Sequence, residues 1–211
     1  MRTDIIRVYS DLNGSDKALN AAEKFAVYNE LAGKNGMHLR LLTEETISML
    51  HGIMDDFSGS FWIESEETKK GLLCRICLTI DRQANMEQEE HILSVASSGK
   101  NESTRGVVGK IRELIRRSIQ SSSSEEEKEL RNMSDAWLGM GTGTGSSVSP
   151  LQADNVWSLQ LYRNNLAAQQ KEKTQEWDEL EKSIIAKLSD EVKVWLMPDE
   201  TRIVVEKLIK T

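Results

Sequence analysis

The chain has 211 residues, of which 38% are hydrophobic and 29% charged, and its formal net charge is −7 at pH 7. This acidic balance argues against a nucleic-acid-binding protein, because counterion release needs a concentrated basic surface. No apolar run is long enough to span a membrane, and Met1 to Asp4 lacks the apolar core of a signal peptide. We therefore expect a cytoplasmic protein that forms a single domain over residues 1–211.

The first half of the chain predicts a strand, two helices and two further strands. Ser15 can cap the first helix, and Gly33 together with Asn35-Gly36 should end it. The second helix carries an apolar face that includes Leu42, Thr46 and Met49. The predicted strands are 4–10, 61–65 and 72–81, and the predicted helices are 15–31 and 39–57.

Both cysteines lie in the predicted strand 72–81. Cys74 and Cys77 form a Cys-x-x-Cys pattern, but residues three apart in a strand point to opposite faces of the sheet. A redox pair or a zinc site would prefer a turn or the start of a helix. The pattern therefore favours buried structural thiols.

The middle of the chain is less regular. Helices are predicted over 86–95 and 107–119, with a loop over 96–101, and a helix should follow from Trp157 to Gln169. Between the predicted helix 107–119 and the helix that starts at Trp157, residues 120–150 are rich in serine, glutamate and glycine. We therefore expect a mobile insert there. Its glycines Gly141, Gly143 and Gly145 suit either a flexible linker or a phosphate-binding lid. Lys100 lies in a loop that either holds an anion or only precedes a capped helix.

The C-terminal part predicts a helix followed by a hairpin. Trp177, Leu180, Ile184 and Leu188 form one stripe of a helix over 176–189. Alternating residues predict strands over 192–197 and 201–209, which need a larger sheet to bury their apolar face. The predicted fold class is α+β, with a mixed, mainly antiparallel sheet of about five strands and helices on one face.

This order of elements resembles the GHKL ATPase fold, a two-layer sandwich shared by gyrase, heat-shock chaperone ATPases and histidine kinases. The nearest likeness is to the anti-sigma-factor serine kinases, over residues 4–81 and 176–209. The resemblance implies that Glu45 stands at the general-base position and that Met49 replaces the asparagine that holds Mg²⁺. It also implies that Asp81, at the end of its strand, contacts adenine, although Arg82-Gln83-Ala84 replaces the glycines expected next.

These departures predict a bacterial, degenerate ATP-binding protein that acts as a regulatory interaction module. ATP is then the expected ligand. The candidate nucleotide-binding residues are Glu45, Met49, Asp81, Lys100, Gly141, Gly143 and Gly145. Whether Mg²⁺ is used stays open, because the thioether of Met49 is a poor ligand for this ion. One alternative is an active serine/threonine protein kinase, and another is a structural scaffold without a ligand pocket. We expect a regulatory protein partner, with a homodimer as a further option, and neither nucleic acid nor membrane.

Overall fold

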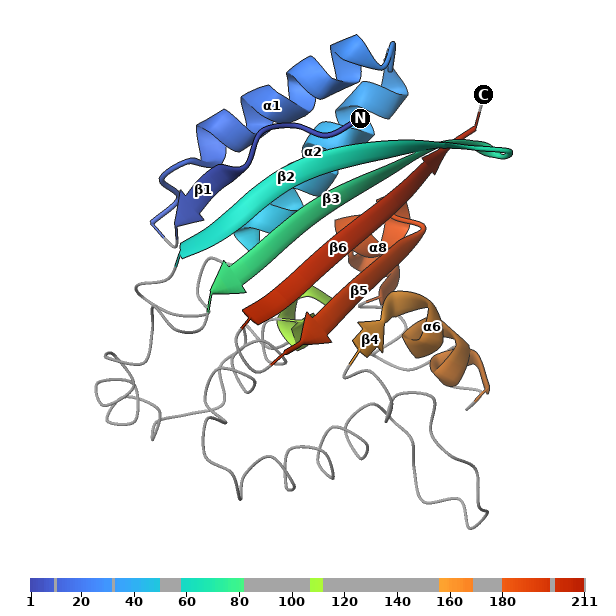
Figure 1. The fold of residues 1–211 in the computed structure, drawn as a ribbon. Helices are drawn as coiled ribbons and strands as arrows, with labels where there is room; N and C mark the ends of the chain where they lie inside the picture. Colours follow the sequence, from blue (N-terminus) through green and yellow to red (C-terminus); the bar gives the residue numbers. More distant parts are fainter. Residues whose placement is uncertain are drawn as a thin grey trace, which may run out of the picture.

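The computed structural model describes residues 1–9, 11–31, 33–49, 58–81, 107–111, 156–168, 180–197 and 200–210. These residues form an α+β structure, in agreement with the predicted class (Figure 1). The strands are β1 Ile6–Tyr9, β2 Ser58–Thr68, β3 Gly71–Asp81, β4 Val156–Ser158, β5 Glu191–Leu196 and β6 Glu200–Ile209. The labelled helices are α1 Ser15–Tyr28, α2 Lys34–Ser48, α6 Leu159–Ala168 and α8 Ile184–Leu188.

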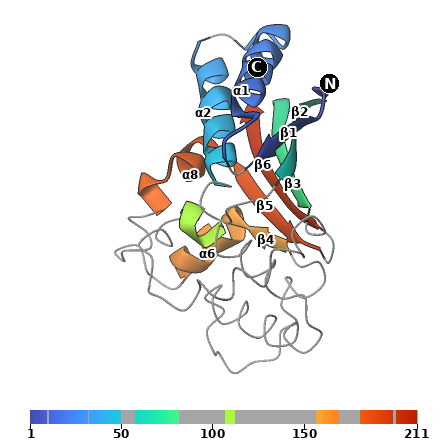
Figure 2. The same ribbon diagram turned by 90° about the vertical axis from the view of Figure 1, so that its left-hand side faces the viewer.

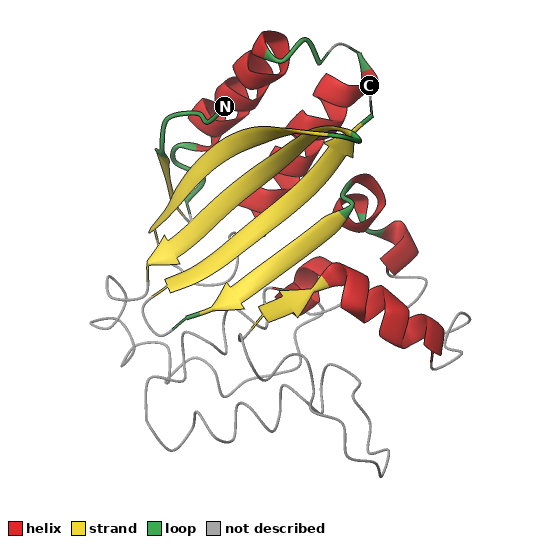
Figure 3. Cartoon of the chain, turned by 45° about the vertical axis from the view of Figure 1, so that its right-hand side comes forward, coloured by secondary structure: helices red, strands yellow, loops and turns green. Residues whose placement is uncertain are grey.

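One open sheet contains all six strands in the order β1-β2-β3-β6-β5-β4, and every neighbouring pair is antiparallel. All five predicted strands lie in this sheet. The C-terminal hairpin inserts β6 beside β3, with Ile76 opposite Val205, so residues 200–209 join the two halves of the chain (Figure 3). The expected need of this hairpin for a larger sheet is therefore confirmed.

The sixth strand, β4, corrects the prediction of a helix from Trp157 to Gln169. Trp157 lies in β4 opposite Val194 and is 3% exposed, and α6 begins only at Leu159. The indole gains more burial in the sheet than a helix end would give it, and this tertiary contact overrides the local pattern.

The helices that the structure describes cover one face of the sheet, as predicted. Figure 2 shows α1, α2, α6 and α8 on the same side of the strands. The burial pattern agrees, because Phe61 and Ile63 in β2 are fully buried while Trp62 and Glu64 between them are partly exposed. Helix-facing side chains from every strand form the hydrophobic core with α1 and α2.

The second helix begins earlier than predicted. Asn35-Gly36 was expected to stop α1, but both residues lie in the first turn of α2, and Gly33 is its N-cap. Gly36 passes close to the preceding loop, where a Cβ atom would lie 2.6 Å from the carbonyl oxygen of Leu31. This glycine therefore serves close packing rather than termination. The predicted continuation of the helix through residues 50–57 lies outside the described residues.

The turn after β1 folds back against the outer side of that strand. The Tyr9 amide donates to the carbonyl oxygen of Asn13 at 3.0 Å, and the Leu12 amide donates to that of Tyr9 at 3.1 Å. Gly14 has φ 86°, and a Cβ atom there would lie 2.1 Å from the Arg7 carbonyl oxygen. The amide and carbonyl groups of Tyr9 and the carbonyl group of Arg7 point away from β2. The turn therefore occupies the free edge of the sheet.

The predicted helix over 176–189 is interrupted where the structure describes it. Residues 180–182 are helical, and Ser183 then caps α8 by accepting a hydrogen bond from the Ala186 amide at 3.4 Å. Residues 107–111 are helical as predicted, with Val107 and Ile111 buried in the core. The predicted helix 86–95, the loop 96–101, residues 112–119 and the insert 120–150 lie outside the described residues.

Candidate functional site

The three predicted site residues that the structure describes lie in elements that run toward one end of the sheet. The pairing of Tyr9 with Ser58, Ile80 with Thr201 and Asp81 with Glu200 places these residues at the same end. Helix α2 runs across the sheet toward this end (Figure 1). Three connections of the chain begin or end here and lie outside the described residues. Residues 50–57 follow α2, residues 82–106 follow β3, and residues 112–155 precede β4. Long connections between secondary-structure elements often carry function.

Helix α2 presents two threonines to the core above this end. Thr43 and Thr46 are both completely buried. The hydroxyl of Thr43 donates to the carbonyl oxygen of Leu39 at 2.9 Å, and that of Thr46 donates to Leu42 at 2.6 Å. These bonds within the helix satisfy the hydroxyl protons, so burial of the threonines carries little penalty.

Glu45 and Met49 lie one turn apart at the end of α2, as the sequence predicted. The Met49 amide donates to the carbonyl oxygen of Glu45 at 3.0 Å, and Met49 is the residue that caps the helix. Glu45 is partly buried, whereas Met49 is 0% exposed and belongs to the hydrophobic core. The thioether therefore packs as an apolar group at the position where the resemblance would require a magnesium ligand.

Asp81 ends β3, which confirms its predicted place in the chain. The last residue of β3 that the structure buries on the helix side is Ile80, which is 1% exposed. Ile76, Leu78 and Ile80 alternate along this face, and Ile80 pairs across the sheet with the fully buried Thr201. An aliphatic side chain thus occupies the helix-facing position at the end of β3. The alternation in the sequence already predicted which residues of β3 share a face.

The remaining predicted ligands cannot be placed. Lys100, Gly141, Gly143 and Gly145 lie outside the described residues. Among the residues that the structure describes, no group of three or more histidine, cysteine or acidic side chains is arranged to hold a metal ion.

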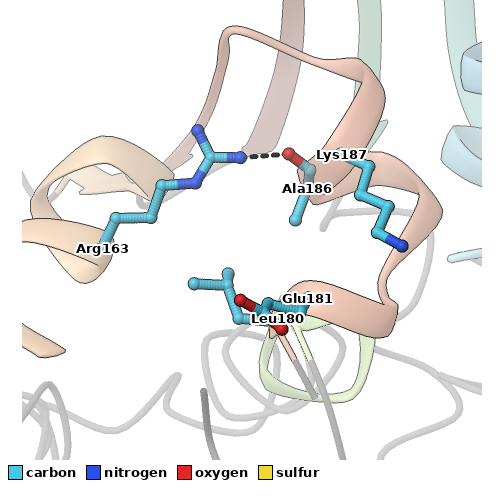
Figure 4. Close-up of a pocket in the computed structure, with 5 residues that line it drawn as sticks. All are labelled: Arg163, Leu180, Glu181, Ala186 and Lys187. Atoms are coloured by element: carbon cyan, nitrogen blue, oxygen red, sulfur yellow. Dashed lines mark hydrogen bonds between the residues drawn. The ribbon is translucent and has the colours of Figure 1, made fainter. Parts of the chain in front are cut away.

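A pocket of about 370 Å³ lies elsewhere, between α6 and the segment that contains α8 (Figure 4). Arg163, Leu180, Glu181, Ala186 and Lys187 line it. The Arg163 guanidinium donates to the carbonyl oxygen of Ala186, which neutralises one end of α8. Glu181 and Lys187 are exposed, so water screens the charges that a ligand would meet there. Sequence periodicity did not indicate this pocket, because it forms between elements that are distant in the chain.

The two cysteines are free and buried, as predicted. Burial raises the pKa of the Cys74 thiol to about 11 and that of the Cys77 thiol to about 12. Cys74 lies on the helix side of β3, and Cys77 pairs with Trp62 and Val204 on the other side. Neither thiol is therefore suited to nucleophilic or redox chemistry at neutral pH.

Comparisons with protein-family models, with curated proteins and with solved structures found no match to this chain. Within the described part of the chain, no helix combines the length and the apolar character needed to cross a membrane.

Proposed function

We propose that the chain is a regulatory interaction module built on a GHKL-like nucleotide-binding fold, whose site no longer assembles magnesium-dependent phosphoryl transfer. The observation that carries the proposal is the complete burial of Met49 one turn after Glu45. Mg²⁺ needs oxygen ligands in octahedral geometry, and a thioether enclosed by hydrocarbon offers none. Loss of that ligand removes the metal that would neutralise a transferring phosphate.

The architecture supports a nucleotide-binding origin. Helices lie on one face of an antiparallel sheet, α2 runs toward the end of β3, and Asp81 stands at that end. Ile80 and Thr201 are buried at this end of the helix-facing layer, which is therefore apolar apart from one hydroxyl group. Apolar surroundings suit an adenine ring, whereas a triphosphate requires cations or free amide groups.

Calorimetry with ATP, with and without Mg²⁺, tests this proposal on the full chain. We expect weak binding that Mg²⁺ improves little, and adenosine should retain most of the affinity of ATP. Asp81→Asn should weaken binding about ten- to a hundredfold, because a hydrogen bond to a charged group contributes about 1.5–3 kcal/mol. Asp190→Asn is the matched control, since Asp190 precedes β5 at the opposite end of the sheet.

The alternatives give different outcomes in the same experiment. Tight ATP binding that depends strongly on Mg²⁺ would overturn the proposal and favour an active protein kinase. A complete lack of binding to ATP and adenosine would favour a scaffold without a ligand pocket.

A further inference from the structure

The pocket between α6 and the segment that contains α8 combines charges of both signs with apolar side chains. Arg163 enters it from α6, and Ala186 faces the guanidinium from α8 (Figure 4). Leu180 and Glu181 lie on a third side. The volume of about 370 Å³ falls within the range of about 300–1,000 Å³ that is usual for small-molecule sites. The pocket therefore has room for a small organic ligand.

The buried part of the lining is apolar. Leu180 is 5% exposed and Ala186 is 3% exposed, and both belong to the hydrophobic core. The aliphatic stem of Arg163 adds hydrocarbon on the side of α6. An apolar group that enters the pocket therefore exchanges water for hydrocarbon contacts, which favours its binding.

Arg163 retains hydrogen-bond donors for a ligand. One terminal nitrogen of its guanidinium donates to the carbonyl oxygen of Ala186. A guanidinium carries five N–H groups in a planar fork, and a carboxylate can accept two of them at once. Among the described residues, no carboxylate forms an ion pair with Arg163 or Lys187. A ligand carboxylate is therefore the group that suits this side of the pocket.

Glu181 brings a negative charge to the same pocket. It directly follows Leu180, and its side chain is exposed at the rim. A ligand with only a negative charge would meet this carboxylate, and a ligand with only a positive charge would meet Arg163 and Lys187. A ligand that carries both charges finds a complementary group for each. The lining therefore favours a zwitterion with an apolar substituent.

We propose that this pocket binds a free apolar α-amino acid. Arg163 holds the carboxylate, and the exposed Lys187 adds a second, weaker attraction. Glu181 accepts hydrogen bonds from the ammonium group, while the side chain of the ligand packs against Leu180 and Ala186. The end of a peptide chain carries only one of these two charges, so it fits the pocket less well. The proposal does not depend on nucleotide binding, because it uses none of the residues of the proposed nucleotide site.

Calorimetry of the full chain with L-phenylalanine and two analogues tests the proposal. 3-Phenylpropionate lacks the ammonium group and 2-phenylethylamine lacks the carboxylate, whereas all three molecules carry the same ring. We expect L-phenylalanine to bind with a dissociation constant of about a millimolar, because water screens the exposed rim of the pocket. Each analogue should bind about three- to tenfold more weakly, because one charged contact is lost.

Two variants separate the roles of the two charges. Arg163→Gln should weaken the binding of L-phenylalanine about tenfold and leave that of 2-phenylethylamine no weaker, because only the carboxylate contact is lost. Glu181→Gln should weaken the binding of L-phenylalanine about threefold and leave that of 3-phenylpropionate no weaker. Lys182→Gln is the matched control, since Lys182 is exposed beside Glu181 but does not line the pocket.

Circular dichroism establishes that each variant is folded. Arg163→Lys keeps the charge but not the planar fork, should also weaken binding, and replaces Arg163→Gln if loss of the bond to Ala186 unfolds that variant. N-acetyl-L-phenylalanine represents the C-terminus of a peptide. Binding of this compound or of 3-phenylpropionate that equals or exceeds that of L-phenylalanine would overturn the proposal, because the ammonium group would then contribute nothing. An affinity for L-phenylalanine that a folded Arg163 or Glu181 variant leaves unchanged, or a lack of binding to the unmodified protein, would overturn it as well.

Discussion

Met49 illustrates how one buried side chain limits the chemistry of a site. It is completely buried at the end of α2, among core residues that include Leu42 and Ile80. A residue in this position can be exchanged only for one of similar volume and polarity, because the interior is closely packed. Introducing the asparagine that the GHKL resemblance implies would therefore change the core before it created a metal site.

We predict that Met49→Asn destabilises the protein by about 2–4 kcal/mol, because it removes apolar burial and places an amide in the hydrophobic core. Met49→Leu keeps volume and polarity and should cost less than about 1.5 kcal/mol. Urea unfolding followed by circular dichroism measures both. Equal stability of the asparagine variant and the unmodified protein would show that the position is open to solvent or to a ligand.

The buried thiols predict a dependence of stability on alkaline pH. Burial raises the pKa of Cys74 and Cys77 from 9.0 to about 11 and about 12. A raised pKa means that the folded state keeps its thiol protons to higher pH than the unfolded state does. The stability that the buried thiols contribute is therefore complete below pH 9 and is lost as the pH rises from there. Between pH 9 and 11 the free energy of unfolding should fall by up to about 1.4 kcal/mol per pH unit for each thiol.

Denaturant titrations at pH 8, 9, 10 and 11 measure this slope. The double variant Cys74→Ala and Cys77→Ala is less stable but should show a shallower decline over the same range. An identical slope in both proteins would mean that other groups, such as tyrosines and lysines, account for the loss.

At the scale of elements, the sequence predicted those strands whose alternation is regular and long. The predicted strands 61–65 and 72–81 lie within β2 and β3, and 192–197 and 201–209 nearly coincide with β5 and β6. β4 has only three residues, too few for a period to appear, and its strand conformation depends on pairing with β5. The start of α2 was missed because Gly36 resembles a helix stop, although it serves packing against Leu31.

The candidate site was predictable in part. The apolar stripe of α2 already included Met49, and the alternation of Ile76, Leu78 and Ile80 fixed which residue of β3 faces the helices. Pairing between β3 and β6 could not be derived from local pattern, because it joins residues more than a hundred positions apart. The sets of side chains that share a face across the whole sheet depend on this pairing, so local pattern could not predict them.

The central place of β6 predicts the effect of a C-terminal truncation. A chain that ends at residue 199 loses the strand between β3 and β5, which leaves β4 and β5 without a connection to the rest of the sheet. It also loses the buried side chains of Ile203, Val205 and Ile209 from the core. We expect an unfolded or aggregated product, seen as loss of the cooperative thermal transition by circular dichroism. A folded truncated chain would indicate that residues 1–81 stabilise themselves.

At the scale of the whole molecule, the sheet makes distant parts of the chain depend on one another. Trp62 lies in β2 and Trp195 in β5, on either side of the β3–β6 pair. If the sheet unfolds as one unit, both tryptophans report the same transition. In a variant that retains only Trp62, and in one that retains only Trp195, the urea midpoint by fluorescence should therefore equal the midpoint by circular dichroism of the same variant.

A fluorescence midpoint that differs from the circular-dichroism midpoint of the same variant would contradict this expectation. It would show that the N-terminal and C-terminal strands unfold independently. Because the chain has five tryptophans, both variants also carry phenylalanine at residues 137, 157 and 177. Trp195→Phe or Trp62→Phe then leaves a single reporter, and phenylalanine retains most of the aromatic contact area.

The turn that folds back on β1 has a consequence for how copies of the chain can accumulate. Asn13 and Gly14 occupy the outer side of this strand, and at the opposite border the strand β4 offers only three residues. Addition of further strands at the borders, the route by which sheets grow into fibres, is therefore obstructed at one border and short at the other.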